Sequence, residues 1–434
     1  MSFVLPFTTP PRTEIFTVED TVAQLIWRGL PTGVLTVLRH DGESTSETRV
    51  GTVGPIGAAE IADLPPNTSV RLELVLDERP IAAHDITTAP TIDDGSITKI
   101  ATISDLHLGE QDFGVVRKFR EHRETVPYPL RCALAAVREA EAWGAELLVI
   151  KGDITELGRP EEWELFDTLL AAISIPVLAI PGNHDTFNKP GSLEAETELQ
   201  RRGLFPSPVH VHDLDHARLV AADSTVRTHS YGRLSHQREA LLESLAVDSP
   251  VLLFAHHHLE PRSVPCFWPL GIRRFDTAAL LREMAEANPD LLISSGHTHR
   301  TRARYEAGVA ITEVGSTKDY PGVWAGYAIH RSGVRQVVRR VAEPTCVTWT
   351  ERTHAVVAGL WGRWSPGRLD DRSFTHRWST ERTTVRPDDA VQSALPGDPS
   401  ERVCPIRVRL VSRYFSFSGF DGISIGTRST TSRP

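Results

Sequence analysis

Apolar and polar residues alternate in two different ways along this chain of 434 residues. Up to about residue 90, short stretches of alternating apolar and polar residues are separated by turn signals rich in Gly, Pro, Asn and Asp, a pattern typical of short β-strands. We expect these strands at residues 21–27, 34–40, 46–53, 58–64 and 69–78. The pattern predicts a small all-β sandwich domain over residues 1–95, followed by a Thr-, Pro-, Asp- and Gly-rich link.

From about Thr98 onward, apolar runs alternate with segments whose apolar residues recur every three or four positions. Such alternation is typical of βα units that build a mostly parallel sheet. We expect strands at residues 100–104, 146–151, 176–181, 218–223, 250–255 and 291–295, and helices at residues 128–144, 161–173, 235–246 and 277–287. The pattern therefore predicts an α/β domain over residues 96–342.

The chain changes again after about Val341, where it becomes rich in Trp and Arg and loses helical periodicity. Residues 345–434 carry 13 Arg, no Lys and 9 Asp or Glu, so this segment is basic in an otherwise acidic chain. We interpret residues 343–434 as a C-terminal extension whose last ~30 residues, rich in Ser, Thr and Gly, are disordered. Its aromatic stretch at residues 359–378 could instead cover part of the α/β domain.

Charge and cysteine content narrow the classes of function. The net charge of -9 disfavours a dedicated nucleic-acid binder, which needs Lys and Arg to neutralise phosphates, but it permits a small phosphate substrate. The 4 cysteines are scattered and form no CxxC pair, so we expect neither a zinc ribbon nor a disulfide scaffold. The first residues lack the features of a signal peptide, and no long uncharged apolar run suggests a membrane span. We expect a cytoplasmic protein.

Polar clusters follow five of the expected strands. In chain order they are Asp105-Leu106-His107, Gly152-Asp153, Gly182-Asn183-His184-Asp185, His256-His257-His258 and Gly296-His297-Thr298-His299. Ligands of open α/β sheets bind at the carboxyl ends of the strands, so we expect the five clusters to converge on one rim. Carboxylates, imidazoles and an amide oxygen suit Mn, Fe or Zn better than Ca.

The ordered series DxH, GD, GNHD, a His run and GHxH resembles the calcineurin-like metallophosphoesterases over residues 98–320. The resemblance implies a four-layer α/β sandwich, in which helices flank two mixed β-sheets. The GNHD and HHH blocks most resemble the cyclic-nucleotide phosphodiesterase type. Within the predicted β-domain, residues 59–78 resemble the strand, Pro-turn, strand passage of fibronectin type III domains.

The resemblance also implies two metal ions and their ligands. The first ion is held by Asp105, His107, Asp153 and His299, and the second by Asp153, Asn183, His257 and His297, so Asp153 bridges the two. In the family, a proline commonly lies two positions after the fourth ligand, whereas this chain has HHHLEP. Aligning Leu259 with that proline selects His257 and leaves His256 as the alternative.

In this family a hydroxide that bridges the two metals attacks phosphorus. By the same resemblance, His184 stabilises the transition state or protonates the leaving oxygen, and Asp185 orients its imidazole. Arg120, His122 and Arg123 are candidates for contacts with substrate phosphate, although a solvated charged stretch is the simpler interpretation. Lys318 and Tyr320 are candidates for the rim of the substrate site.

The expected function is hydrolysis of a small phosphodiester, a cyclic nucleotide among the candidates. A phosphomonoesterase or nucleotidase and a metal-dependent nuclease are the alternative enzymes, and an inert metal-stabilised scaffold is the alternative of another class. The purple acid phosphatases have a Tyr ligand three residues after the bridging Asp, where this chain has Glu156. The sequence indicates no membrane or nucleic-acid partner, and it gives no indication of the oligomeric state.

Overall fold

The computed structural model describes residues 11–42, 44–92, 97–114, 118–121, 124–260 and 269–379. The C-terminal tail for which disorder is predicted lies outside the described residues, as do His122 and Arg123. Among the described helices, none combines the length and the apolar character that crossing a membrane requires.

Two antiparallel sheets form the N-terminal region. The three-stranded sheet has the order β1 (Arg12–Val18), β2 (Ala23–Arg28), β5 (Ile56–Ile61), and the four-stranded sheet has the order β4 (Ser44–Val53), β3 (Gly33–Asp41), β6 (Ser69–Leu76), β7 (Arg79–Thr87). Side chains such as Leu25, Leu35 and Leu72 fill the core between them. The strand-rich region is thus present, while the domain limits and the fibronectin III-like identity stay predictions.

Two six-stranded sheets form the remainder of the described structure. The first has the order β12 (Val177–Ile180), β11 (Leu147–Lys151), β8 (Ile97–Ile103), β19 (Val323–His330), β20 (Gly333–Arg340), β21 (Ser373–Arg377). The second has the order β13 (Val209–Asp213), β14 (Arg218–Ala222), β15 (Val251–Ala255), β16 (Leu291–Ser295), β18 (Val309–Glu313), β17 (Arg302–Glu306). Parallel and antiparallel pairs occur in both sheets, so both are mixed.

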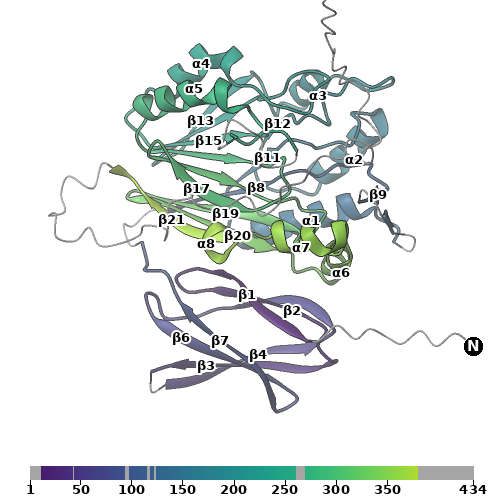
Figure 1. Cartoon of the computed structure of the whole chain (residues 1–434), viewed down its shortest axis with the longest axis vertical. Helices are drawn as coiled ribbons and strands as arrows, with labels where there is room; N and C mark the ends of the chain where they lie inside the picture. The colour runs from purple at the N-terminus through teal and green to yellow at the C-terminus, as the bar shows by residue number, and fades with distance from the viewer. Residues whose placement is uncertain are drawn as a thin grey trace, which may run out of the picture.

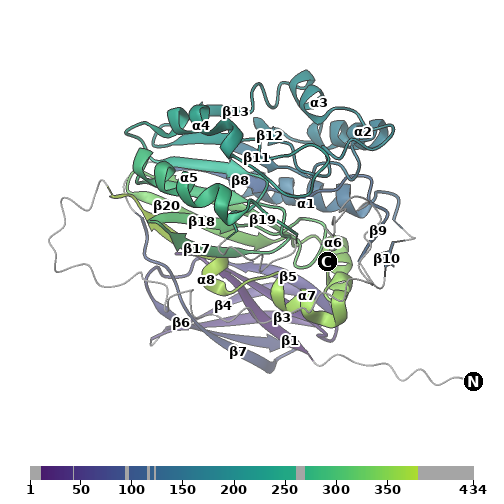
Figure 2. The ribbon, with the colours of Figure 1, turned by 45° about the horizontal axis from the view of Figure 1, so that its top comes forward.

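The helices lie on the outer faces of the two sheets (Figures 1 and 2). They are α1 (Tyr128–Ala142), α2 (Pro160–Leu170), α3 (Ala195–Arg201), α4 (Arg238–Leu245) and α5 (Arg274–Ala287), with a 3-10 turn η1 (Ser235–Gln237) before α4. Helix α1 contacts β8 and β19, whereas α4 contacts β13 and β14. Every residue of β11, β15 and β16 is buried, which explains their uninterrupted apolar runs. The predicted sandwich of two mixed sheets flanked by helices is confirmed.

The C-terminal segment packs against the first sheet up to Ser379. It forms α6 (Pro344–Thr353), the 3-10 turn η2 (Val356–Gly359), α7 (Leu360–Trp364), α8 (Leu369–Arg372) and β21, which pairs with β20. Trp349 and Trp378 are almost completely buried. Apart from α6, these elements are at most five residues long, too short for helical or strand periodicity to appear in the sequence. A two-stranded ribbon of β9 (Asp112–Phe113) and β10 (Phe119–Arg120) lies beside α6 and α7, where Arg352 donates to the carbonyl oxygen of Arg120 at 3.2 Å.

The N-terminal sheets are attached to the α/β region by buried contacts. Phe16 and Ile26 belong to the same hydrophobic core as the strands of the first large sheet. The side-chain amide of Gln24 donates to the carbonyl oxygen of Arg340 at 2.8 Å and accepts from its N–H, also at 2.8 Å. Arg339 pairs with Glu19 in the same interface. The N-terminal region therefore covers the outer face of β20 in the way that helices cover the rest of that sheet.

Candidate metal centre

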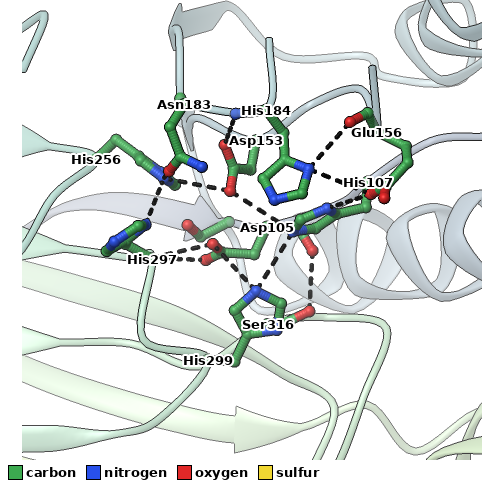
Figure 3. A network of polar contacts seen from close by, with 12 residues as sticks. Asp105, His107, Asp153, Glu156, Asn183, His184, His256, His297, His299 and Ser316 are labelled. Carbon is green, nitrogen blue, oxygen red and sulfur yellow. Dashed lines mark hydrogen bonds and ion pairs between the residues drawn. The ribbon is translucent and has the colours of Figure 1, made fainter. Parts of the chain in front are cut away.

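The structure brings the five predicted clusters together at the ends of β8, β11, β12, β15 and β16 (Figure 3). Four groups of side chains each place one ligand atom per residue within 4.8 Å of the others. The groups are Asp105, His107 and His299; His107, Asp153 and His184; Asp105, Asp153 and His256; and His256, His257 and His297. Because successive groups share members, they form one continuous set of donors rather than separate sites.

One half of this centre is built from His107 and His299. Nδ1 of His107 lies 2.8 Å from the Glu156 carboxylate, and Nδ1 of His299 lies 2.6 Å from the Asp319 carboxylate. The two Nε2 atoms face each other at 3.3 Å. Imidazoles whose outer nitrogen is held by a carboxylate are the usual partners of metal ions, so the two inner nitrogens are placed to bind one cation together.

The other half is built from His256 and His297 in the same way. Nδ1 of His256 lies 2.8 Å from the carbonyl oxygen of Lys151, and Nε2 of His297 lies 2.9 Å from that of Leu270. The inward nitrogens of the two rings are 3.2 Å apart. The amide oxygen of Asn183 is 3.2 Å from Nε2 of His256, which adds an oxygen donor to this half.

Two buried aspartates lie between the halves. Oδ2 of Asp153 is 3.6 Å from Nε2 of His107 and 3.3 Å from Nε2 of His256, so one carboxylate oxygen faces both halves. Oδ1 of Asp105 lies 3.5 Å from Nε2 of His299 and accepts a hydrogen bond from the backbone N–H of His297 at 3.0 Å. This arrangement fits a bridging Asp153 with Asp105 beside it.

Left-handed backbone conformations aim these side chains inward. Positive φ angles occur at Asp105 (55°), His107 (48°), Asp153 (48°), His297 (69°) and His299 (50°). Residues with a Cβ avoid this region, and each such position costs on the order of 1 kcal/mol or more. Five of them in one site indicate that packing of the two sheets compensates for the strain, as is common at functional sites.

Two glycines allow the loops to approach one another closely. A side chain at Gly152, whose φ is 83°, would start 2.7 Å from Nδ1 of His256. A side chain at Gly296 would collide with Oγ of Ser104 and lie 2.7 Å from Oδ2 of Asp105. Both glycines are therefore required by contacts between loops, and Gly152 is required by its positive φ as well.

The His run places two imidazoles in the centre. Of the three histidines, His256 is the one whose ring nitrogen lies close to the carboxylate oxygens of both Asp105 and Asp153. It follows directly on the last residue of β15. The ring nitrogens of His257 lie close to those of His256 and His297 instead. Nδ1 of His257 lies 2.8 Å from Oγ of Ser224, and its buried Nε2 has no hydrogen-bond partner in the described structure. The geometry thus favours His256, the alternative of the sequence alignment, as the donor beside Asp153. His257 as the ligand stays a prediction.

Single substitutions distinguish how much His256 and His257 each contribute to metal binding. We expect His256→Ala to weaken binding of the second metal about 100-fold, because a donor next to the shared carboxylate is lost. We expect His257→Ala to weaken it about tenfold or less, and His258→Ala, whose imidazole lies 3.4 Å from Glu260, to leave the affinity near the wild-type value. Titration of metal-free protein with Mn or Zn measures all three. A larger loss of metal affinity in His257→Ala than in His256→Ala would show that His257 is the ligand, as the alignment of Leu259 with the family's proline predicts.

His184 differs from the surrounding histidines because its side chain is 24% exposed. Nδ1 of His184 lies 2.9 Å from the carbonyl oxygen of Glu156 and 3.4 Å from its carboxylate. Burial by itself lowers the pKa of His184, but the carboxylates of Glu156 and Asp153 outweigh it and raise the pKa to about 10. An accessible imidazole beside the Asp153 carboxylate is placed to donate a proton.

Asp185 has a different place from the one expected for it. Its carboxylate accepts hydrogen bonds from the N–H groups of Ile154 (3.1 Å), Thr155 (2.7 Å) and Gly182 (2.8 Å), and from the Thr155 hydroxyl (2.6 Å). Asp185 thus ties the GNHD loop to the GD loop, and in the described structure Glu156 orients the His184 imidazole instead. The orienting role expected of Asp185 has no direct contact with the His184 imidazole behind it among the described hydrogen bonds, and it stays a prediction.

Several residues that support the centre were not predicted in that role. Glu156 and Asp319 hold His107 and His299, and Lys151 donates from its buried Nζ to Oγ of Ser294 at 3.0 Å. Glu156 follows the GD motif by three residues, so its position could have been noticed. Asp319 lies outside every motif, and nothing in the sequence indicates its partner.

The residues expected to contact the substrate do not line an open rim around the metal centre. Lys318 is 1% exposed and pairs with Glu110, and Tyr320 is 5% exposed, so neither forms an open rim. Arg120 lies in β10 and pairs with Asp112 at the surface.

Comparisons with known proteins agree with this geometry. Residues 98–301 match the model of the calcineurin-like phosphoesterases. The chain is 34% identical over 179 residues to a glycerophosphodiester phosphodiesterase GpdQ of Enterobacter lignolyticus, a match that covers 38% of this chain and 61% of that protein. It is 30% identical over 170 residues to a probable GpdQ of Arcobacter nitrofigilis, covering 36% of this chain and 57% of the relative.

A third relative is matched over more of its length. The chain is 30% identical over 209 residues to a probable cyclic nucleotide phosphodiesterase of Synechococcus, a match that covers 48% of this chain and 75% of that protein. The chain spans less than two thirds of the two GpdQ proteins. The matched region contains all five polar clusters, and on this basis the chain belongs to the calcineurin-like phosphoesterase family.

Proposed function

We propose that this protein is a dinuclear metal-dependent phosphodiesterase that hydrolyses a small phosphate diester. The observation that carries the proposal is the continuous set of buried carboxylate and imidazole donors with one accessible histidine, His184, beside it. A purely structural metal site does not require an imidazole that is open to solvent. The names of the relatives support a diester as the substrate, with glycerophosphodiesters and cyclic nucleotides as the two candidate classes.

The residues present fit a pair of metal ions. Ring nitrogens of two histidines face each other in both halves, at 3.3 Å and 3.2 Å, and Nε2 of His257 is a buried atom without a hydrogen-bond partner among the described residues. We assign Asp105, His107, Asp153 and His299 to one ion, and Asp153, Asn183, His256 and His297 to the other. Mn, Fe or Zn suits this donor set. When bound, two such ions supply an activated water nucleophile and neutralise charge on the phosphate.

The other residues of the centre orient the reacting groups and transfer a proton. Glu156 holds His107 and His184 at once, through contacts of 2.8 Å and 3.4 Å, so it couples a metal ligand to the proposed proton donor. The backbone N–H of His184 donates to Oδ1 of Asp153 at 2.8 Å, which leaves Oδ2 of that carboxylate facing the centre. His184 then protonates the leaving alkoxide as the ester bond breaks.

A substrate screen tests the proposal. Purified protein with Mn, Fe or Zn added is assayed against glycerophosphodiesters, cyclic nucleotides, bis-p-nitrophenyl phosphate and nucleoside monophosphates, and its metal content is measured in parallel. We expect two metals per chain and faster hydrolysis of diesters than of monoesters. A preference for monoesters would indicate a nucleotidase instead. Complete inertness with two metals bound would indicate a scaffold.

A further inference from the structure

The short helix α7 of the C-terminal segment lies against the metal centre. Nε1 of Trp361 in this helix donates to Oδ1 of Asp319 at 3.3 Å. Oδ2 of the same carboxylate lies 2.6 Å from Nδ1 of His299, whose Nε2 is 3.5 Å from Asp105. An uninterrupted series of polar contacts therefore runs from the C-terminal segment to the centre.

Packing holds the Trp361 indole in this position. Its ring centre lies 6.2 Å from that of His299, 6.1 Å from that of Phe113 and 5.6 Å from that of Trp364. A side chain at Gly362 would collide with the His354 imidazole, so the close approach of α7 to the preceding chain requires a glycine there. Trp361 lies well beyond residues 98–301, the part of the chain that matches the family model.

Asp319 is placed so that its carboxylate needs a hydrogen-bond donor at each of its two oxygens. Its carboxylate is completely buried, and one of its oxygens accepts from His299. A buried charged oxygen without a donor is costly, and a carboxylate held at one oxygen only can rotate away from the imidazole. The orientation of a ligating histidine depends on this kind of partner, whose loss commonly weakens metal binding 10- to 100-fold.

We propose that Trp361 is a positioning residue of the metal centre, which fixes Asp319 and through it the His299 imidazole. The inference rests on the proposed function, because it takes His299 as a ligand of the first ion. It gives the C-terminal segment a function: α7 completes the support of one metal ligand from outside the family's core region.

Trp361→Phe tests the proposal because it removes the indole N–H and keeps an aromatic ring. Affinity of the metal-free protein for Mn or Zn is measured by competition with a chelator, and thermal unfolding of the metal-free protein checks the fold. We expect Trp361→Phe to weaken the first site about tenfold. Trp364→Phe, a change of the same kind in the same helix, should stay within about twofold of the wild type.

A double-mutant cycle with Asp319→Asn decides whether Trp361 acts through Asp319. We expect Asp319→Asn to weaken the first site about 10- to 100-fold, with little further loss when Trp361→Phe is added. An unchanged affinity in Trp361→Phe, or an equal loss from it with and without Asp319→Asn, would overturn the proposal. If Trp361→Phe unfolds more easily than Trp364→Phe, Trp361→Tyr repeats the test. A lower kcat/KM at unchanged metal affinity would instead place Trp361 in the substrate site. Wild-type protein that binds no metal would refute the proposed function itself.

Discussion

Replacing Asp153 by Ala is expected to reduce turnover by at least about 10³-fold, a larger loss than removal of any ligand that serves one ion. One oxygen of this carboxylate faces His107 at 3.6 Å and His256 at 3.3 Å, while the other accepts from the backbone of His184. Its removal takes a donor from both halves and frees the loop that carries His184. The occupancy of both metals should fall.

The measurement combines elemental analysis with initial rates on the best diester of the screen. Asp213→Ala is the control, because Asp213 is 66% exposed in β13 and pairs only with Arg218 among the described contacts. It should keep both the metal content and the rate. Wild-type turnover by Asp153→Ala would exclude this carboxylate as the bridge, and full loss of one metal with the other retained would make it a ligand of a single ion.

The strands and their terminal polar clusters were predictable because local pattern determines them. Buried parallel strands give uninterrupted apolar runs, as in β11 and β15, and the carboxyl ends of such strands meet at one edge. For this reason residues as far apart as Asp105 and His299 could be assigned to one site. The exact register at the end of a strand was harder to predict, because a shift of one position decides whether His256 or His257 faces Asp153.

Contacts between loops that are far apart in the chain could not be predicted from the local sequence pattern. Asp185 looked like the partner of its neighbour His184, yet its carboxylate turns to the N–H groups of Ile154 and Thr155, which need an acceptor where the GD loop turns. Glu156 then takes the orienting role. Asp319 and Trp361 join the centre only because β19 and α7 fold back onto it, and no sequence motif marks that return.

In the N-terminal region, too, the sequence did not indicate the contacts with distant parts of the chain. Alternation predicted five of its seven strands but missed β1 and β7. It also did not predict that Phe16 and Ile26 enter the core of the α/β region or that Glu19 meets Arg339. Phe16 and Ile26 fit strands of an independent sandwich equally well. Their burial against β20 depends on the relative placement of two folded units, which amphipathic patterns do not encode.

Replacing His184 by Ala is expected to lower kcat about 10²- to 10⁴-fold, the usual contribution of general acid catalysis. Metal content should remain at two per chain, because the side chain is more exposed than the proposed ligands and its Nδ1 is held by Glu156. His212→Ala, which removes an exposed histidine of β13, is the control and should behave as the wild type. Loss of a metal in His184→Ala would show that His184 is a ligand.

The leaving group of the substrate distinguishes a proton donor from a residue that only stabilises charge. A diester of p-nitrophenol releases a stable phenolate that needs no proton, whereas an alkyl diester releases an alkoxide that does. If His184 is the acid, His184→Ala should lose much less activity on the p-nitrophenyl diester than on the alkyl diester. Equal losses on both would assign His184 to stabilisation of the transition state, because its charge would then matter regardless of where the proton goes.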